Sequence, residues 1–138
     1  MTRTSIRGIA VILLALTVGG AACGGDKEKK ASEDRYELRA SAKDVATGLG
    51  QIETLTTQIA LAVSADAKAA KAQAEGIEKL WEPIEGTIRA NDKDSYIRFE
   101  DDFAALEKAA GDADSTKAQT AAKDVSEAVK AYVGKYPG

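Results

Sequence analysis

Residues 41–63 read SAKDVATGLGQIETLTTQIALAV, and this stretch decides the fold class. Its large apolar residues recur every three or four positions, at Val45, Leu49, Ile52, Leu55, Ile59 and Val63. Because this spacing returns to one side of an α-helix, the stretch predicts an amphipathic helix. Ser41, with Asp44 three residues later, is a weaker form of the capping box that marks a helix start. Gly48 and Gly50 lower the helix propensity, so we expect an irregular helix there.

The next segment has the same spacing but is interrupted by a proline. We expect a second helix that starts after Ser64 as its N-cap and continues to the Asn91-Asp92 turn. Its apolar stripe is Ile77, Leu80, Trp81, Ile84 and Ile88. Pro83 lies inside the stripe and cannot donate a backbone hydrogen bond, so the sequence predicts a kink or a break there.

Two more amphipathic segments complete the chain. Asn91-Asp92 is expected to cap the third helix, which should end at Gly111 and has the stripe Tyr96, Phe99, Phe103, Leu106 and Ala110. The fourth is expected to start at Ser115 and to end at Gly134 and Pro137, with the stripe Ala118, Ala122, Val125, Val129 and Tyr132. No alternating β-pattern is present. Since the connections are short, residues 41–138 predict an all-α, up-down four-helix bundle domain.

The amino-terminal residues have the pattern of a targeting segment. Arg3 and Arg7 supply a positive start, and no residue from Gly8 to Ala22 is charged. This apolar run suits a signal peptide, because a spanning helix needs about 20 apolar residues. We therefore expect residues 1–22 to be a cleaved lipoprotein signal peptide and residues 23–40 to be a flexible polar tether.

Cys23 is the only cysteine in the chain, and small residues precede it. The sequence Gly20-Ala21-Ala22-Cys23 resembles a bacterial lipobox, although Gly20 stands where such motifs usually have Leu, Val or Ile. The resemblance implies that Cys23 carries acyl chains, palmitate among them. It also implies a protein held at the extracytoplasmic face of the cell membrane. The alternatives are an ordinary secretory signal with an incidental cysteine, or an uncleaved anchor.

The composition excludes several classes of chemistry. The chain contains no histidine, so it has no imidazole base, no serine–histidine nucleophile and no histidine-ligated metal site. One cysteine permits no internal disulfide. With a net charge of -3, a nucleic-acid-binding surface is not expected.

The stretch Trp81-Glu82-Pro83-Ile84-Glu85, followed by an acidic turn and an aromatic, acidic helix, resembles part of the imelysin-like family. That family includes lipoproteins of bacterial Efe-type iron-uptake systems, and the similarity covers roughly Glu78 to Phe103. The resemblance implies a helical bundle and a link to iron transport. The family also has a His-x-x-Glu metal motif, which cannot be transferred to a chain without histidine.

Three acidic residues flank the apolar stripes and form a candidate metal-binding set: Glu82, Glu85 and Glu100. If the second and third helices are antiparallel, Glu82 should lie level with Glu100. Carboxylates from facing helices suit a hard ion such as iron, manganese or calcium. The alternative is a solvated acidic face, in which Glu85 pairs with Arg89 one turn later. Trp81 is likewise a candidate partner surface or a packing residue of the core.

We therefore expect a non-enzymatic accessory or binding lipoprotein, linked to metal uptake. The alternative is a structural or protein-interaction lipoprotein of the cell envelope with no metal role. Its partners would be the membrane, through the lipid, and an envelope permease or another protein. A third reading, an enzyme that uses Glu82 and Glu85 as acid and base, requires a closed pocket around those residues.

Overall fold

The computed structural model describes residues 40–138, which form five helices and contain no strand within that range. The helices are α2 (Ala42–Ala62), α3 (Ala67–Ala74), α4 (Gly76–Asn91), α5 (Lys93–Gly111) and α6 (Ser115–Lys135). The predicted all-α fold is confirmed. The predicted signal peptide, residues 1–22, and the predicted lipid attachment at Cys23 lie outside the described residues.

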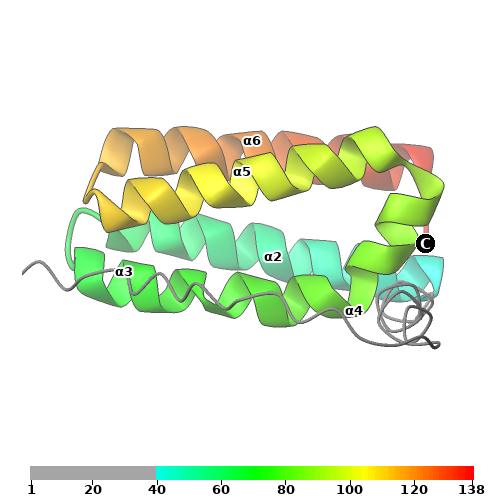
Figure 1. Ribbon diagram of the computed structural model, residues 1–138, viewed down its shortest axis with the longest axis horizontal. Coiled ribbons are helices and arrows are strands. Elements are labelled where there is room, and N and C mark those ends of the chain that lie inside the picture. The colour runs from blue at the N-terminus through cyan, green and yellow to red at the C-terminus, as the bar shows by residue number, and fades with distance from the viewer. Residues whose placement is uncertain (1–39) are drawn as a thin grey trace, which may run out of the picture.

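The helices form a closed four-membered ring (Figure 1). α3 and α4 follow one another along one side of the molecule and together make the second member of the ring. α2 packs against α6 on one side and against α3 and α4 on the other, and α5 closes the ring between α6 and the α3–α4 pair. Neighbouring members run in opposite directions, so the bundle has the predicted up-down connectivity.

α2 begins where the sequence indicates. The Ser41 hydroxyl accepts the backbone N–H of Asp44 at 3.1 Å and so caps the helix. The expected irregularity at Gly48 and Gly50 is wrong, because α2 is one continuous helix. Gly48 serves packing instead: a Cβ atom there would lie 3.0 Å from the Ile84 side chain of α4. The missing side chain lets α2 and α4 approach one another.

The second segment differs from the prediction at two points. Its N-cap is Asp66, whose carboxylate accepts the backbone N–H of Ala69 at 2.9 Å, and not Ser64. The break lies at Glu75, between α3 and α4, whereas Pro83 lies inside α4. Gly76 lowers helix propensity at the observed break. Pro83 removes one backbone hydrogen bond, but buried Trp81 and Ile84 on either side of it hold α4 in place.

The two later connections use aspartate caps. Asp92 caps α5 as predicted, since its carboxylate accepts the backbone N–H of Ser95 at 3.1 Å. α6 is capped by Asp114 and not by the predicted Ser115; the Asp114 carboxylate accepts the backbone N–H of Lys117 at 3.0 Å. α6 also continues through Gly134 to Lys135, so Gly134 does not end it.

The core contains the apolar stripes that the sequence predicts, with aromatic residues on the α4–α5–α6 side. The Trp81 ring centroid lies 5.3 Å from that of Phe99 and 5.2 Å from that of Phe103. Tyr132 of α6 extends this cluster, because its ring lies 6.3 Å from that of Phe99. Alanines line much of the remaining interface, which permits close helix packing. Of the helices between residues 40 and 138, none has the length and hydropathy needed to span a membrane.

The C-terminal end of α6 fastens the turn between α4 and α5. The Tyr136 hydroxyl donates to the Asn91 carbonyl at 2.9 Å, and the Asn91 side-chain amide donates to the Tyr132 hydroxyl at 3.1 Å. The Lys135 ammonium donates to the Asp92 carboxylate at 2.8 Å. These contacts hold three helices together at one end of the bundle, and we refer to them as the α6 latch.

Candidate functional site

Trp81 is a core residue at the interface between α4 and α5. Its side chain is 1% exposed, so the ring offers no open face to a partner and serves packing. The indole N–H donates to the Glu100 carboxylate at 2.5 Å. The structure therefore brings one predicted acidic residue, Glu100, directly to the predicted tryptophan.

Glu82 and Glu85 have different surroundings from Glu100. Glu82 is exposed, and Glu85 is partly buried. The groove beside Glu100 is lined instead by Glu78 of α4 and Glu107 of α5. Of the three predicted acids, only Glu100 lies in this groove, and the other two acids that line it are Glu78 and Glu107.

We call this hollow the acidic groove. It has a volume of about 170 Å³, and its acidic residues are Glu78, Glu100 and Glu107. Ile77, Trp81, Phe103 and Ala104 supply the rest of its lining. Glu75, at the break between α3 and α4, lies close enough to act on Glu107 electrostatically. The groove therefore combines several carboxylates with an apolar floor.

Desolvation and like charges both act on the acidic groove. Burial raises the pKa of the Glu107 carboxyl, and the neighbouring charges of Glu78, Glu100 and Glu75 raise it further. A carboxylate in such surroundings is stabilised by any cation that approaches it. The acidic groove therefore favours the approach of positive charge.

The acidic groove is not a preformed metal cage. Across residues 40–138, no three or more cysteine, aspartate or glutamate side chains come close enough together to hold a metal ion. The carboxylate oxygens are chemically suited to hard cations, but they are spread along the helix interface.

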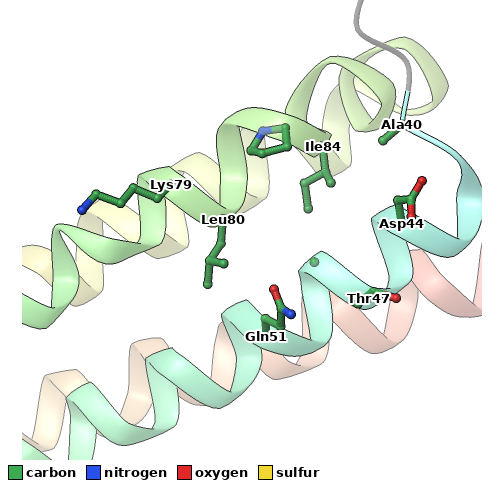
Figure 2. A pocket seen from close by; sticks show the side chains of 9 residues that line it. Ala40, Asp44, Thr47, Gln51, Lys79, Leu80 and Ile84 are labelled. Atoms are coloured by element: carbon green, nitrogen blue, oxygen red, sulfur yellow. The ribbon is translucent and has the colours of Figure 1, made fainter.

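A larger hollow than the acidic groove lies on another side of the bundle, between α2 and α4, and has a volume of about 360 Å³. Figure 2 shows Ala40 at one end of it, Lys79 at the other, and Leu80 and Ile84 extending from α4 toward α2. We call it the α2–α4 hollow. Glu82 and Glu85 line neither this hollow nor the acidic groove.

Sequence reasoning recognised the helix faces but not the register between the helices. Glu78 belongs to the same acidic flank of its helix as Glu82 and Glu85, and Glu107 to the same flank as Glu100. The signal for Glu78 and Glu107 was therefore present. Selecting them required knowing that Trp81 packs level with Glu100, which depends on how the aromatic rings fit together.

The chain was compared with models of protein families, with curated proteins and with solved structures, and none of the three comparisons gives a match. The lipobox-like and imelysin-like resemblances therefore stay predictions that rest on their own residues.

Proposed function

We propose that this protein is a non-enzymatic accessory protein, tethered to the extracytoplasmic face of the cell membrane through a lipid on Cys23, that binds its ligand or partner at the surface of the bundle. The observation that carries the proposal is the closed ring of helices around an aromatic core. Because Trp81, Phe99 and Tyr132 fill the interior, the hollows described above lie at helix interfaces on the surface. We therefore expect binding to take place on the outer surfaces of the helices.

The lipid anchor can be tested by replacing the cysteine. Cys23→Ser should move the protein from the membrane fraction to the soluble fraction or the medium, and should abolish incorporation of a labelled fatty acid. Ser5→Ala in the same targeting segment is the matched control and should change neither result. Unchanged fatty-acid labelling in Cys23→Ser would disprove the anchor.

For the ligand, we propose a cation, with metal uptake as the process that the protein assists. Support comes from the acidic groove, where burial and three neighbouring acids raise the pKa of Glu107. The metal is cargo that exchanges readily, because the carboxylates do not form a cage. Iron is the first candidate, followed by manganese and calcium, since carboxylate oxygens are hard ligands.

The metal proposal is tested by titrating the full chain with Fe³⁺, Mn²⁺ and Ca²⁺ in a calorimeter. Glu100→Gln and Glu107→Gln should weaken binding, and added salt should weaken it further because the attraction is electrostatic. Glu127→Gln removes an acid of the same kind from α6 and should have no effect. Binding that is absent at millimolar metal, or equal in all three variants, would remove the metal role and leave the tethered accessory protein.

A second candidate, a protein-interaction lipoprotein without a metal role, is favoured by the small-residue hollows beside α6. One of about 320 Å³ is floored by Ala105, Ala109 and Ala121, and one of about 240 Å³ contains Ala60 and Ala122. Leu61 borders the second hollow and is 67% exposed, so its apolar side chain is available to a partner at this place.

This candidate predicts a partner that contacts Leu61. A photo-crosslinking residue at position 61, in intact cells, should capture an envelope protein such as a permease, and the same residue at Thr116 should not. If position 61 captures nothing while metal binding depends on Glu100 and Glu107, the cation-binding function is favoured.

A further inference from the structure

We propose that α3 is a lid that opens by local unfolding while the other helices stay folded, and that its opening joins the hollow beneath it to the acidic groove. The two joints of the lid are the turn at residues 63–66 and the break at Glu75 and Gly76. This motion needs no cation, so it stands apart from the function proposed above.

Little apolar burial holds α3 against its neighbours. The helix packs on α2, α4 and α5. Of its eight residues, Ala70 and Ala74 are buried, and Ala67 and Ala69 are partly buried. α6, by comparison, buries seven residues, which include two valines and a tyrosine. Because the stabilisation from burial grows with the apolar area removed from water, the small alanine side chains hold α3 weakly.

The side chains of α3 form no bond to another helix within residues 40–138. Its polar side chains are those of Lys68, Lys71 and Gln73, which are all exposed and have neither a hydrogen bond nor an ion pair in the described part of the chain. Other neighbouring helices are joined by such bonds. The Ser126 hydroxyl of α6, for example, donates to the Glu53 carboxylate of α2 at 2.5 Å. Side-chain bonds therefore do not fasten α3.

The joint between α3 and α4 is a weak point of the helical backbone. Among the helices between residues 40 and 138, α4 alone starts without a side-chain cap, since its N-cap residue, Glu75, accepts no backbone N–H with its carboxylate. Gly76 follows directly and has the low helix propensity of glycine. A helix of eight residues is not stable in water by itself, so α3 unfolds once it leaves its neighbours.

Opening of α3 enlarges the acidic groove. A hollow of about 110 Å³ lies between α3 and α5, and its lining consists of Lys71, Ala74, Glu75 and Glu107. Glu107 also lines the acidic groove, so the two hollows meet at this side chain. Unfolding of α3 withdraws Lys71 and Ala74 from the wall. The open groove is therefore longer and more negative than the closed one, and it includes apolar surface of α2 and α5 that α3 covers when closed.

Amide hydrogen exchange in the wild-type chain tests the lid. The Ala70 N–H of α3 and the Ala118 N–H of α6 are matched, because each is bonded at 2.9 Å to the carbonyl of the aspartate that caps its helix. Both alanines are 0% exposed. After correction for intrinsic rates, Ala70 should exchange on the order of tenfold or more faster than Ala118, because α3 opens locally. Equal exchange at the two amides, or faster exchange at Ala118, would overturn the proposal.

Two glycine substitutions test the joint. A Cβ atom at Gly76 would lie 3.5 Å from the Leu55 side chain, which is an ordinary contact, so alanine fits there. Gly76→Ala should slow exchange at Ala70 by about two- to fivefold, because alanine favours the helical state of the joint. No slowing in this variant would contradict a lid with its joint at Gly76.

The matched control is Gly50→Ala, the same substitution within α2, where a Cβ atom meets nothing within 4 Å. It should leave exchange at Ala70 unchanged, because α2 stays folded when the lid opens. If Gly50→Ala slows exchange at Ala70 as much as Gly76→Ala does, the amide exchanges through global unfolding and α3 is not a lid.

Discussion

At the scale of single residues, the bond between Trp81 and Glu100 explains why a glutamate stands beside the core. The indole N–H lies on a side chain that is 1% exposed, so it depends on a protein acceptor. Glu100 supplies that acceptor at 2.5 Å while the glutamate itself stays at the surface. The same carboxylate thus stabilises the α4–α5 interface and contributes charge to the acidic groove.

Glu100→Ala should therefore destabilise the bundle more than removal of an ordinary surface acid. A buried donor without an acceptor costs about 1–3 kcal/mol, and the free energy of unfolding in urea should fall by that amount. Asp101→Ala, at the adjacent exposed position, should change it by no more than about 0.5 kcal/mol. Similar values for the two variants would show that the bond adds no stability.

Asp92 should make stability depend on pH in the acid range. The bond from the Lys135 ammonium, followed by that from the Ser95 N–H, lowers the pKa of Asp92 from 3.8 to about 2. Because the pKa is lower in the folded state, the stabilisation is present above about pH 4 and is lost as the pH falls toward 2. Asp92→Asn keeps a good N-cap but loses the charge.

Urea unfolding at a series of pH values checks this. The wild type should be more stable than Asp92→Asn at neutral pH, and the difference should shrink between about pH 4 and about pH 2. Asp94→Asn, which removes one charge from the same turn of α5, should show a smaller change with pH. A pH-independent difference for Asp92→Asn would contradict the role of the charge.

At the scale of elements, the helix starts are set by where the connection places the capping side chain. Serines stand near the starts of α3 and α6, but aspartates cap them. Ala113, just before the α6 cap, has a positive φ of 56°, which turns the chain from α5 toward Asp114. The geometry of the connection therefore determines which residue caps each helix. Proximity of a serine in the sequence does not determine it.

Alanine substitutions should distinguish these residues. Asp66→Ala and Asp114→Ala should each lower the free energy of unfolding by about 0.5–2 kcal/mol, because each leaves a helix N–H without its acceptor. Ser64→Ala and Ser115→Ala, at the caps expected from sequence alone, should have effects within about 0.5 kcal/mol. A larger loss for either serine would contradict the observed caps.

The two glycines of α2 should respond differently to alanine. A Cβ at Gly50 meets nothing within 4 Å, so Gly50→Ala should stabilise the helix by about 0.5–1 kcal/mol. A Cβ at Gly48 lies 3.0 Å from Ile84, and the cost of moving that side chain should offset much of the same gain. Thermal unfolding of both variants measures the difference, and equal stabilisation would show that Ile84 adapts freely.

At the scale of the whole molecule, the α6 latch makes the two ends of the bundle unequal. Tyr136, Lys135 and Tyr132 fasten the α4–α5 turn through side chains. The α5–α6 turn at the opposite end is held by local contacts, such as the bond from the Asp112 N–H to the Lys108 carbonyl at 2.9 Å and the Asp114 cap, with no bond from a distant helix end among those described. Local opening should therefore differ between the two turns.

Tyr136→Phe removes the hydroxyl that donates to Asn91 and should speed amide exchange at Asp92. The amide of Asp112, in the unlatched turn, serves as the internal control and should exchange at an unchanged rate. Hydrogen exchange measured by NMR reports both sites in one sample. Equal acceleration at the two turns would mean that the variant lowers global stability and that the latch has no local role.

Much of this molecule could be predicted from the sequence because its helices have clear apolar stripes. Val45, Leu49, Ile52 and Ile59 are all buried as their spacing indicates. The break at Glu75 was missed because Pro83 gave the stronger local signal, although Gly76 directly follows the break and lowers helix propensity there. The acids at Glu78 and Glu107 were missed because the register of α4 against α5 follows from how Trp81 fits between Phe99 and Phe103.

The bond between Trp81 and Glu100 also makes the intrinsic fluorescence of Trp81 a reporter of the acidic groove. Trp81 is the single tryptophan of the chain, so all of its indole emission comes from one place, the wall of the acidic groove. A cation that draws the Glu100 carboxylate away from the indole N–H changes the polarity around the ring and shifts the emission wavelength. Ligand screening therefore needs no attached dye, and the signal arises at the surface on which the cation is proposed to bind.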